Sequence, residues 1–128
     1  MRLARALLVL GAVVAGGFGL VYTIRPEWLA GLVDIALPTA AARADFRATY
    51  GGAQLGIAAF CALAAARPPW YRPALLALGL TVGGFGVVRL SSLALDGVFP
   101  RLLLAVGVIE LAGAFLCLVA FRQLDRSA

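Results

Sequence analysis

Residues 102–121 read LLLAVGVIELAGAFLCLVAF, an apolar run that a single charged side chain, Glu110, interrupts. A run of about 20 apolar residues is long enough to cross the roughly 30 Å hydrocarbon core of a bilayer as an α-helix. Three runs of similar length precede it, at residues 4–24, 47–66 and 74–95. The sequence therefore predicts an all-α, polytopic membrane protein, with one transmembrane four-helix bundle over residues 1–128.

The composition supports lipid as the solvent of this chain. Hydrophobic residues make up 63% and charged residues 13%, whereas a soluble domain is about half apolar and a quarter charged. The cationic side chains are all arginines and lie mainly at the ends of apolar runs, which is typical of membrane proteins and argues against nucleic-acid binding. The chain has no His, no metal-ligand spacing and no nucleotide-binding loop, so we expect no cofactor and no metal.

The arginine distribution predicts the orientation of the bundle. Six arginines fall on one side, namely Arg2, Arg5, Arg67, Arg72, Arg122 and Arg126, and four on the other, namely Arg25, Arg43, Arg47 and Arg101. This predicts a multi-pass protein of the cytoplasmic (plasma) membrane with both termini in the cytoplasm. The first run is too long for the apolar part of a signal peptide and no small-residue cleavage site follows it, so we interpret it as a retained helix.

The predicted outer loop, residues 25–46, is too long for a tight turn. Pro26 is suited to open a short helix, because proline is favoured at the first helical position. With Trp28 near its start, such a helix can lie flat in the membrane interface. An ordinary packed loop is the alternative.

Two pairs of runs share sequence elements, which suggests a parallel repeat of two plus two helices. Gly16-Gly17-Phe18-Gly19 recurs as Gly83-Gly84-Phe85-Gly86, and Gln54-Leu55 aligns with Glu110-Leu111. Repeats of equal orientation are related by an axis along the membrane normal. Chance similarity among Ala-, Gly- and Leu-rich segments is the alternative. If the repeat is real, Tyr22 and Arg89 occupy equivalent places.

Arg89 and Glu110 are charged residues inside predicted spans, where they are expensive and need a partner or a cavity. Arg89 lies about 10 Å and Glu110 about 13 Å below the outer ends of their helices, so we expect an ion pair. Five further residues are expected near this layer: Arg47, Tyr50 and Gln54 on one face of the second helix, Asp45 as a cap at its start, and Tyr22 on the first helix.

Several functions are compatible with this outer polar layer. The layer can simply fix the helix register, or it can bind a lipid-like, quinone-like or anionic small molecule. We favour a binding or accessory protein, with membrane lipids and other copies or membrane proteins as partners. The alternatives are a membrane enzyme that uses Glu110 as general acid/base and a small proton-coupled transporter. Cys61 and Cys117 are expected to act as small apolar residues, with a redox pair as the alternative.

The segment from Asp45 to Gly56, DFRATYGGAQLG, resembles a bacterial membrane-protein family catalogued as domain of unknown function four-three-four-five. The family pattern has an Asp, then Arg-Ala, then Tyr-Gly-Gly at the second helix, and later an Arg, an Asp-Gly turn and a Glu. Here the later residues are Arg89, Asp96-Gly97 and Glu110. The resemblance covers most of the chain and implies the four-helix fold without an activity. The chain is also similar, more loosely, to DoxX-type membrane proteins, some of which are linked to quinones.

Overall fold

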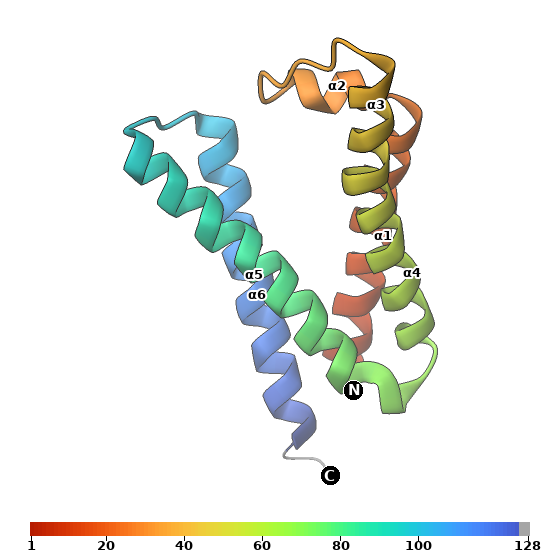
Figure 1. The fold of residues 1–128 in the computed structure, drawn as a ribbon. Helices are drawn as coiled ribbons and strands as arrows, with labels where there is room; N and C mark the ends of the chain where they lie inside the picture. The colour runs from red at the N-terminus through yellow and green to blue at the C-terminus, as the bar shows by residue number, and fades with distance from the viewer. Residues whose placement is uncertain (126–128) are drawn as a thin grey trace.

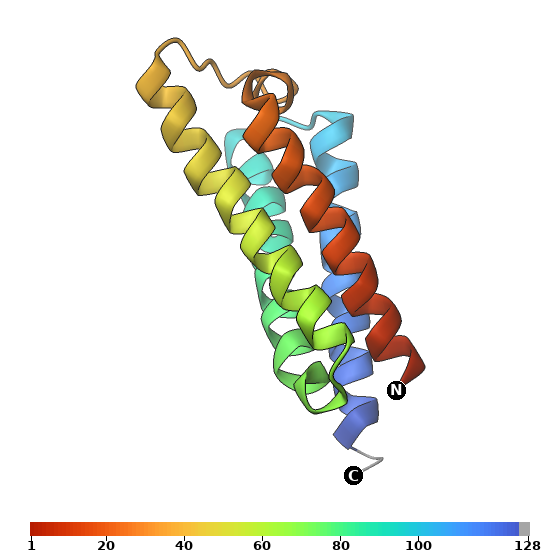
Figure 2. The same ribbon diagram turned by 90° about the vertical axis from the view of Figure 1, so that its right-hand side faces the viewer.

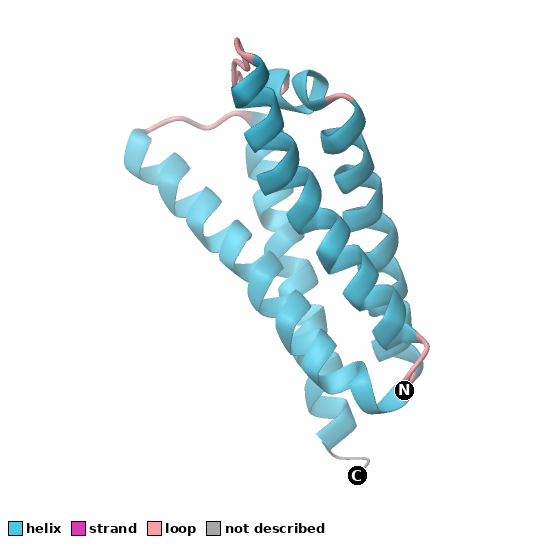
Figure 3. Cartoon of the chain, turned by 45° about the vertical axis from the view of Figure 1, so that its right-hand side comes forward, coloured by secondary structure: helices cyan, strands magenta, loops and turns pink. Residues whose placement is uncertain are grey.

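The computed structural model describes residues 1–125, which fold into helices joined by short connections (Figure 3). In chain order the elements are α1 (Arg2–Ile24), α2 (Pro26–Gly31), α3 (Ala40–Phe46), the π-helix η1 (Arg47–Gly52), α4 (Ala53–Ala65), the 3₁₀-helix η2 (Pro68–Trp70), α5 (Tyr71–Asp96) and α6 (Arg101–Asp125). Four stretches are long and apolar enough to cross a membrane: Arg2–Ile24, Ala40–Ala65, Pro68–Asp96 and Arg101–Leu124. The predicted all-α membrane fold is confirmed.

The four long helices form two hairpins (Figure 1). The first hairpin packs α1 against the continuous stretch α3–η1–α4, and the second packs α5 against α6. Contacts within each hairpin far exceed contacts between them. The first and last described residues lie at the same end of the bundle, which we call the terminal end (Figure 2). The opposite, loop end carries α2 and the connection from α5 to α6, and the hairpins diverge toward it (Figure 1).

The core that joins the hairpins lies in the terminal half. It buries side chains from every long helix, among them Leu8 of α1, Cys61 of α4, Leu75 of α5 and Cys117 of α6. Outward-facing positions are apolar as well, with Leu80 70% and Ile109 68% exposed. A helix that is apolar all round is typical of a membrane span, because the surrounding lipid is as apolar as the core.

The second membrane helix begins earlier than the sequence predicts. We expected it at Arg47 with Asp45 as its cap, but it begins at Ala40. Thr39 caps it, because its hydroxyl accepts a 3.0 Å hydrogen bond from the amide of Ala42. The three alanines after this cap are strong helix formers, so the helix extends through part of the predicted outer loop. Asp45 lies exposed within α3 and caps no helix.

Two helix ends follow local sequence signals. α2 begins at Pro26, as the sequence predicts, and Trp28 on this helix is 62% exposed. α5 ends at Asp96, where Gly97 takes a left-handed conformation with φ 66°. Glycine is favoured at this position, because a side chain in that conformation clashes with the backbone.

Corresponding glycines allow the two helices of each hairpin to approach closely. A methyl group added to Gly19 of α1 would lie 2.9 Å from Leu55 of α4, and one added to Gly86 of α5 would lie 3.0 Å from Leu111 of α6. One turn earlier, Gly16 faces Ala58 and Gly83 faces Ala114 in the same way. Small residues at such crossings let the backbones come together, which is how helices associate in lipid.

We predict that alanine at these contacts destabilises the protein, whereas alanine at neighbouring open glycines does not. Gly19→Ala and Gly86→Ala should each lower the free energy of unfolding by about 1–3 kcal/mol, because Leu55 and Leu111 must move. Gly17 and Gly84 have no atom within 4 Å of an added methyl group. Gly17→Ala and Gly84→Ala should therefore be neutral or stabilising, because alanine favours the helix by about 1 kcal/mol.

Unfolding of the four purified variants by denaturant in micelles, followed by circular dichroism, measures this difference. Equal losses from all four substitutions would contradict the packing described here.

Candidate functional site

Arg89 and Glu110 form a two-pronged ion pair between α5 and α6. Nε of Arg89 donates a 2.9 Å hydrogen bond to Oε2 of Glu110, and Nη2 donates a 2.8 Å bond to Oε1. The Arg89 side chain is 31% exposed and that of Glu110 is 15% exposed. Charge-assisted bonds in this parallel arrangement are among the strongest in proteins and fix the orientation of both groups.

Glycines on both helices of the second hairpin place this pair. An added methyl group at Gly86 would lie 3.1 Å from Cβ of Glu110, and one at Gly107 would lie 3.5 Å from Cδ of Arg89. The stem of each charged side chain therefore crosses the backbone of the opposite helix at a position without a side chain. This close approach brings the guanidinium and the carboxylate to hydrogen-bonding distance.

Tyr22 of α1 brings the first hairpin near the ion pair but forms no hydrogen bond with it. It is close enough to Arg89 for the two side chains to interact electrostatically. Its ring also packs on Tyr50, with centroids 5.7 Å apart, and on Phe46, with centroids 5.5 Å apart. Phe18 completes an aromatic cluster with them, 6.3 Å from Tyr22. We call Tyr22, Tyr50, Arg89 and Glu110 the polar layer.

The sequence analysis did not single out Phe18 and Phe46 as members of this cluster. A signal was present, because each lies four residues before a tyrosine, at Tyr22 and Tyr50. Residues with this spacing are neighbours on one face of a helix. The two pairs belong to α1 and to the α3–η1 stretch, which pack against each other.

Two other predicted residues do not join the ion pair. Arg47 turns to α1, where its Nε donates a 3.0 Å hydrogen bond to the carbonyl of Thr23. Gln54 is half-buried on α4, and its side chain forms no hydrogen bond with residues 1–125. We expected Arg47, Tyr50 and Gln54 to share one face. The π-helix Arg47–Gly52 alters this register, because it widens the turn on which the spacing depends.

The polar layer contains hydrogen-bond donors that no side chain or carbonyl of residues 1–125 accepts. These are Nη1 of Arg89 and the hydroxyls of Tyr22 and Tyr50, and none of the three is fully buried. By contrast, the hydroxyl of Tyr71 donates to the carbonyl of Ala65 at 3.3 Å. Unpaired donors are costly inside a membrane, because lipid chains offer no acceptor. The layer is therefore able to accept a polar partner.

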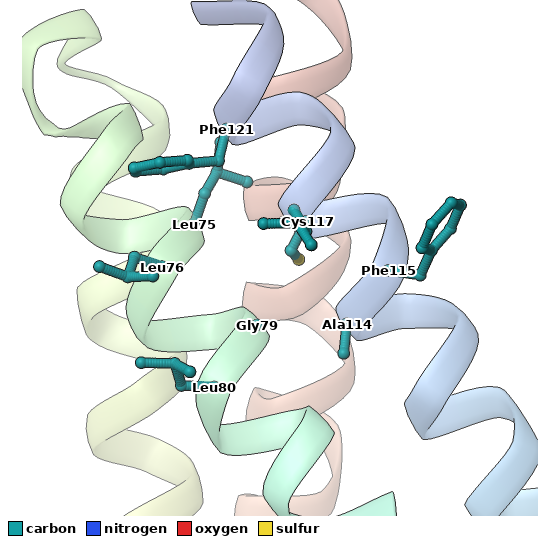
Figure 4. A pocket seen from close by; sticks show the side chains of 9 residues that line it. Leu75, Leu76, Gly79, Leu80, Ala114, Phe115, Cys117 and Phe121 are labelled. Carbon is teal, nitrogen blue, oxygen red and sulfur yellow. The ribbon is translucent and has the colours of Figure 1, made fainter. Parts of the chain in front are cut away.

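An apolar groove lies apart from the polar layer, between α5 and α6 in the terminal half (Figure 4). It has a volume of about 240 Å³, and its walls include Leu76, Leu80 and Phe121, with Gly79 and Cys117 where the helices meet. No residue of the polar layer lines it. Cys61 and Cys117 are free thiols buried in the core near this level, and residues 1–125 contain no cluster of ligands suited to a metal ion.

The comparisons with known proteins place the chain in a family. The family model for the domain of unknown function DUF4345 matches residues 3–121. This chain is a member of the DUF4345 family. The match spans all four long helices and every residue of the polar layer, and confirms the resemblance seen at Asp45–Gly56. No curated protein and no solved structure matches the chain, and the looser likeness to DoxX-type proteins stays a prediction.

In this DUF4345 member, we predict that removing one partner of the ion pair costs more stability than removing both. Arg89→Met or Glu110→Met should each lower the free energy of unfolding by about 3 kcal/mol, because a charge is left without its partner in an apolar surrounding. The double variant leaves no charge without a partner, so it should lose less than either single variant. A double-mutant cycle on protein in bicelles tests this, and additive losses would show that the two groups do not stabilise each other.

Proposed function

We propose that this DUF4345 member is a membrane-embedded binding or accessory protein whose polar layer holds the head of an amphiphilic small molecule. The observation that best supports this proposal is the set of unused donors, Nη1 of Arg89 and the hydroxyls of Tyr22 and Tyr50, for which residues 1–125 supply no acceptor. A bound head group with oxygen acceptors would satisfy these donors, while its tail remains in hydrocarbon.

The charge of the layer favours a neutral head group over an anion. Glu110 already balances the charge of Arg89 through two hydrogen bonds, so the pair has no net charge to offer. What remains is a set of donors beside aromatic rings, since Tyr22, Tyr50 and Phe46 lie within 5.7 Å of one another by centroid distance. A flat ring with carbonyl oxygens, as in a quinone-like molecule, fits donors and aromatic faces together.

The packing of the hairpins leaves the polar layer outside their shared core. That core, which includes Leu8, Cys61, Leu75 and Cys117, belongs to the terminal half. Tyr22 lies two residues before the end of α1 and Arg89 seven residues before the end of α5, and both of these helix ends are at the loop end (Figure 1). A ligand at the polar layer would therefore leave the core intact.

The geometry favours binding over acid/base catalysis or proton-coupled transport. Both carboxylate oxygens of Glu110 accept hydrogen bonds from Arg89, which holds the group as a paired carboxylate. A general acid or a proton carrier must instead exchange its proton with a substrate or a water chain. In an accessory role, the protein would bind the ligand at the same layer and sense it for, or present it to, another membrane protein or another copy of this chain.

We also propose that the two hairpins are a parallel repeat. The contacts of Gly16 with Ala58 and of Gly19 with Leu55 in the first hairpin have counterparts in the second. There Gly83 contacts Ala114 and Gly86 contacts Leu111. In that scheme Tyr22 corresponds to Arg89, and both reach the polar layer. Equal losses from the two contact-glycine substitutions would support this relation, whereas a loss confined to one hairpin would argue against it.

For the membrane, we propose the cytoplasmic membrane with the terminal end inside. Arg2, Arg5, Arg67, Arg72 and Arg122 lie at that end, and Arg126 lies outside the described residues. A reporter protein that is active only in the cytoplasm should be active when it is fused after residue 128. Activity of an exported reporter at the same position would reverse the orientation.

We predict that the protein binds a decyl benzoquinone more tightly than decyl phosphate, which has the same tail and an anionic head. Tyr22→Phe should weaken binding of the quinone about tenfold, because one hydrogen bond is lost. Tyr71→Phe removes one hydroxyl at the terminal end and should leave the affinity unchanged. The double variant Arg89→Met/Glu110→Met keeps the site neutral and should abolish measurable binding.

Native mass spectrometry of the protein released from micelles measures these affinities, and circular dichroism checks the fold of each variant. Tighter binding of decyl phosphate than of the quinone would contradict a neutral head group and indicate an anionic ligand. If neither amphiphile binds the folded protein, the ion pair only fixes the register of α5 and α6.

A further inference from the structure

Arg2 and Arg5, on the first turns of α1, have no partner among residues 1–125. Both side chains are exposed, and neither forms an ion pair or a hydrogen bond with a described side chain. The first turn of α1 contains no acidic residue. Arg67 at the same end differs, because its guanidinium lies over the ring of Trp70, 5.3 Å from the centroid.

An apolar track continues from these two arginines along the same side of α1. A shallow, wide-open groove runs along one face of this single helix and is lined by Arg2, Arg5, Ala6, Val9, Leu10 and Val13. Leu10 is 57% and Val13 is 67% exposed. From Arg2 to Val13 the helix rises about 16 Å, which is close to half of the roughly 30 Å hydrocarbon thickness. The apolar track therefore has the length of one leaflet, and the two arginines lie at the end of it that faces the head groups.

The net charge of the terminal end around Arg2 and Arg5 is positive. Arg67, Arg72 and Arg122 belong to the same end, where Asp125, the last residue of α6, is the one acidic residue between 1 and 125. Glu27, Asp34, Asp45 and Asp96 belong to the loop end, and Glu110 lies between. Neither Arg2 nor Arg5 forms an ion pair with a described side chain. An anion is therefore the ligand that this end attracts.

We infer that this face of α1 is a binding site for an anionic phospholipid. Arg2 and Arg5 hold the phosphate and the charged head group, and one acyl chain lies along Ala6, Val9, Leu10 and Val13. Free phosphate would use the two arginines but leave the apolar track without an occupant. A second copy of this chain would bring the same positive charges together at this face. The inference does not rest on the ligand proposed for the polar layer.

The double variant Arg2→Gln/Arg5→Gln tests the site, and Arg67→Gln/Arg122→Gln is its matched control. Both variants lose two positive charges at the terminal end, but only the first loses residues that line the groove. The probes are phosphatidylglycerol and phosphatidylcholine with identical acyl chains, added to protein in neutral micelles. Native mass spectrometry counts the lipid molecules that each folded variant retains.

We expect the unaltered protein to retain phosphatidylglycerol in preference to phosphatidylcholine. The groove variant should bind phosphatidylglycerol about 30-fold more weakly, since each arginine near a lipid surface contributes a factor of about five. The control variant should lose less than threefold. Unchanged retention by the groove variant, an equal loss in the control, or equal retention of both lipids would overturn the inference. Displacement of the lipid by millimolar inorganic phosphate would show an anion site that does not use the apolar track.

Discussion

Hydrocarbon offers no hydrogen-bond partner, and this constraint governs where polar groups occur in the structure. Backbone groups form their hydrogen bonds within helices, and the hydroxyls of Thr23 and Ser91 donate to carbonyls of their own helices. Arg89 and Glu110 cannot do so, because a charge needs an opposite charge at the same depth. The two-pronged bond between them ties α5 to α6 at one register. Among the donors that are left over, those at Arg89, Tyr22 and Tyr50 lie in the polar layer, which is why we propose a ligand there.

The close approach of helices in each hairpin depends on glycine at the crossing points. Gly19 lies against Leu55 in the first hairpin, and Gly86 lies against Leu111 in the second. In lipid there is no hydrophobic force to press helices together, so the gain comes from contact between closely spaced backbones. In the second hairpin the same approach also brings Glu110 to Arg89. Helix packing and the formation of the ion pair thus have one structural cause.

The sequence predicted the four spans and the ion pair because both follow from helix length. At 1.5 Å per residue, the distances of Arg89 and Glu110 from their helix ends give their depth directly. The prediction failed for Arg47, because residues at spacings of three and seven share one face only in a regular α-helix. The π-helix Arg47–Gly52 breaks that regularity, and Arg47 bonds to Thr23 instead. The start of the second helix was also missed, because the charges at Arg43 and Asp45 resembled a membrane boundary although Thr39 caps the helix.

The two hairpins pack through similar glycine contacts but differ in polarity. Under the proposed repeat, Arg89 and Glu110 of the second hairpin correspond to Tyr22 and Gln54 of the first, so the charges of the second are balanced internally while the first has neutral groups. If both halves carried the ion pair, a second arginine would stand in the place of Tyr22, near Arg89, and like charges in a low-dielectric surrounding repel strongly. A tyrosine in that place avoids the repulsion and adds an aromatic face and a donor. This difference between the halves supports the proposal of a neutral, ring-shaped head group.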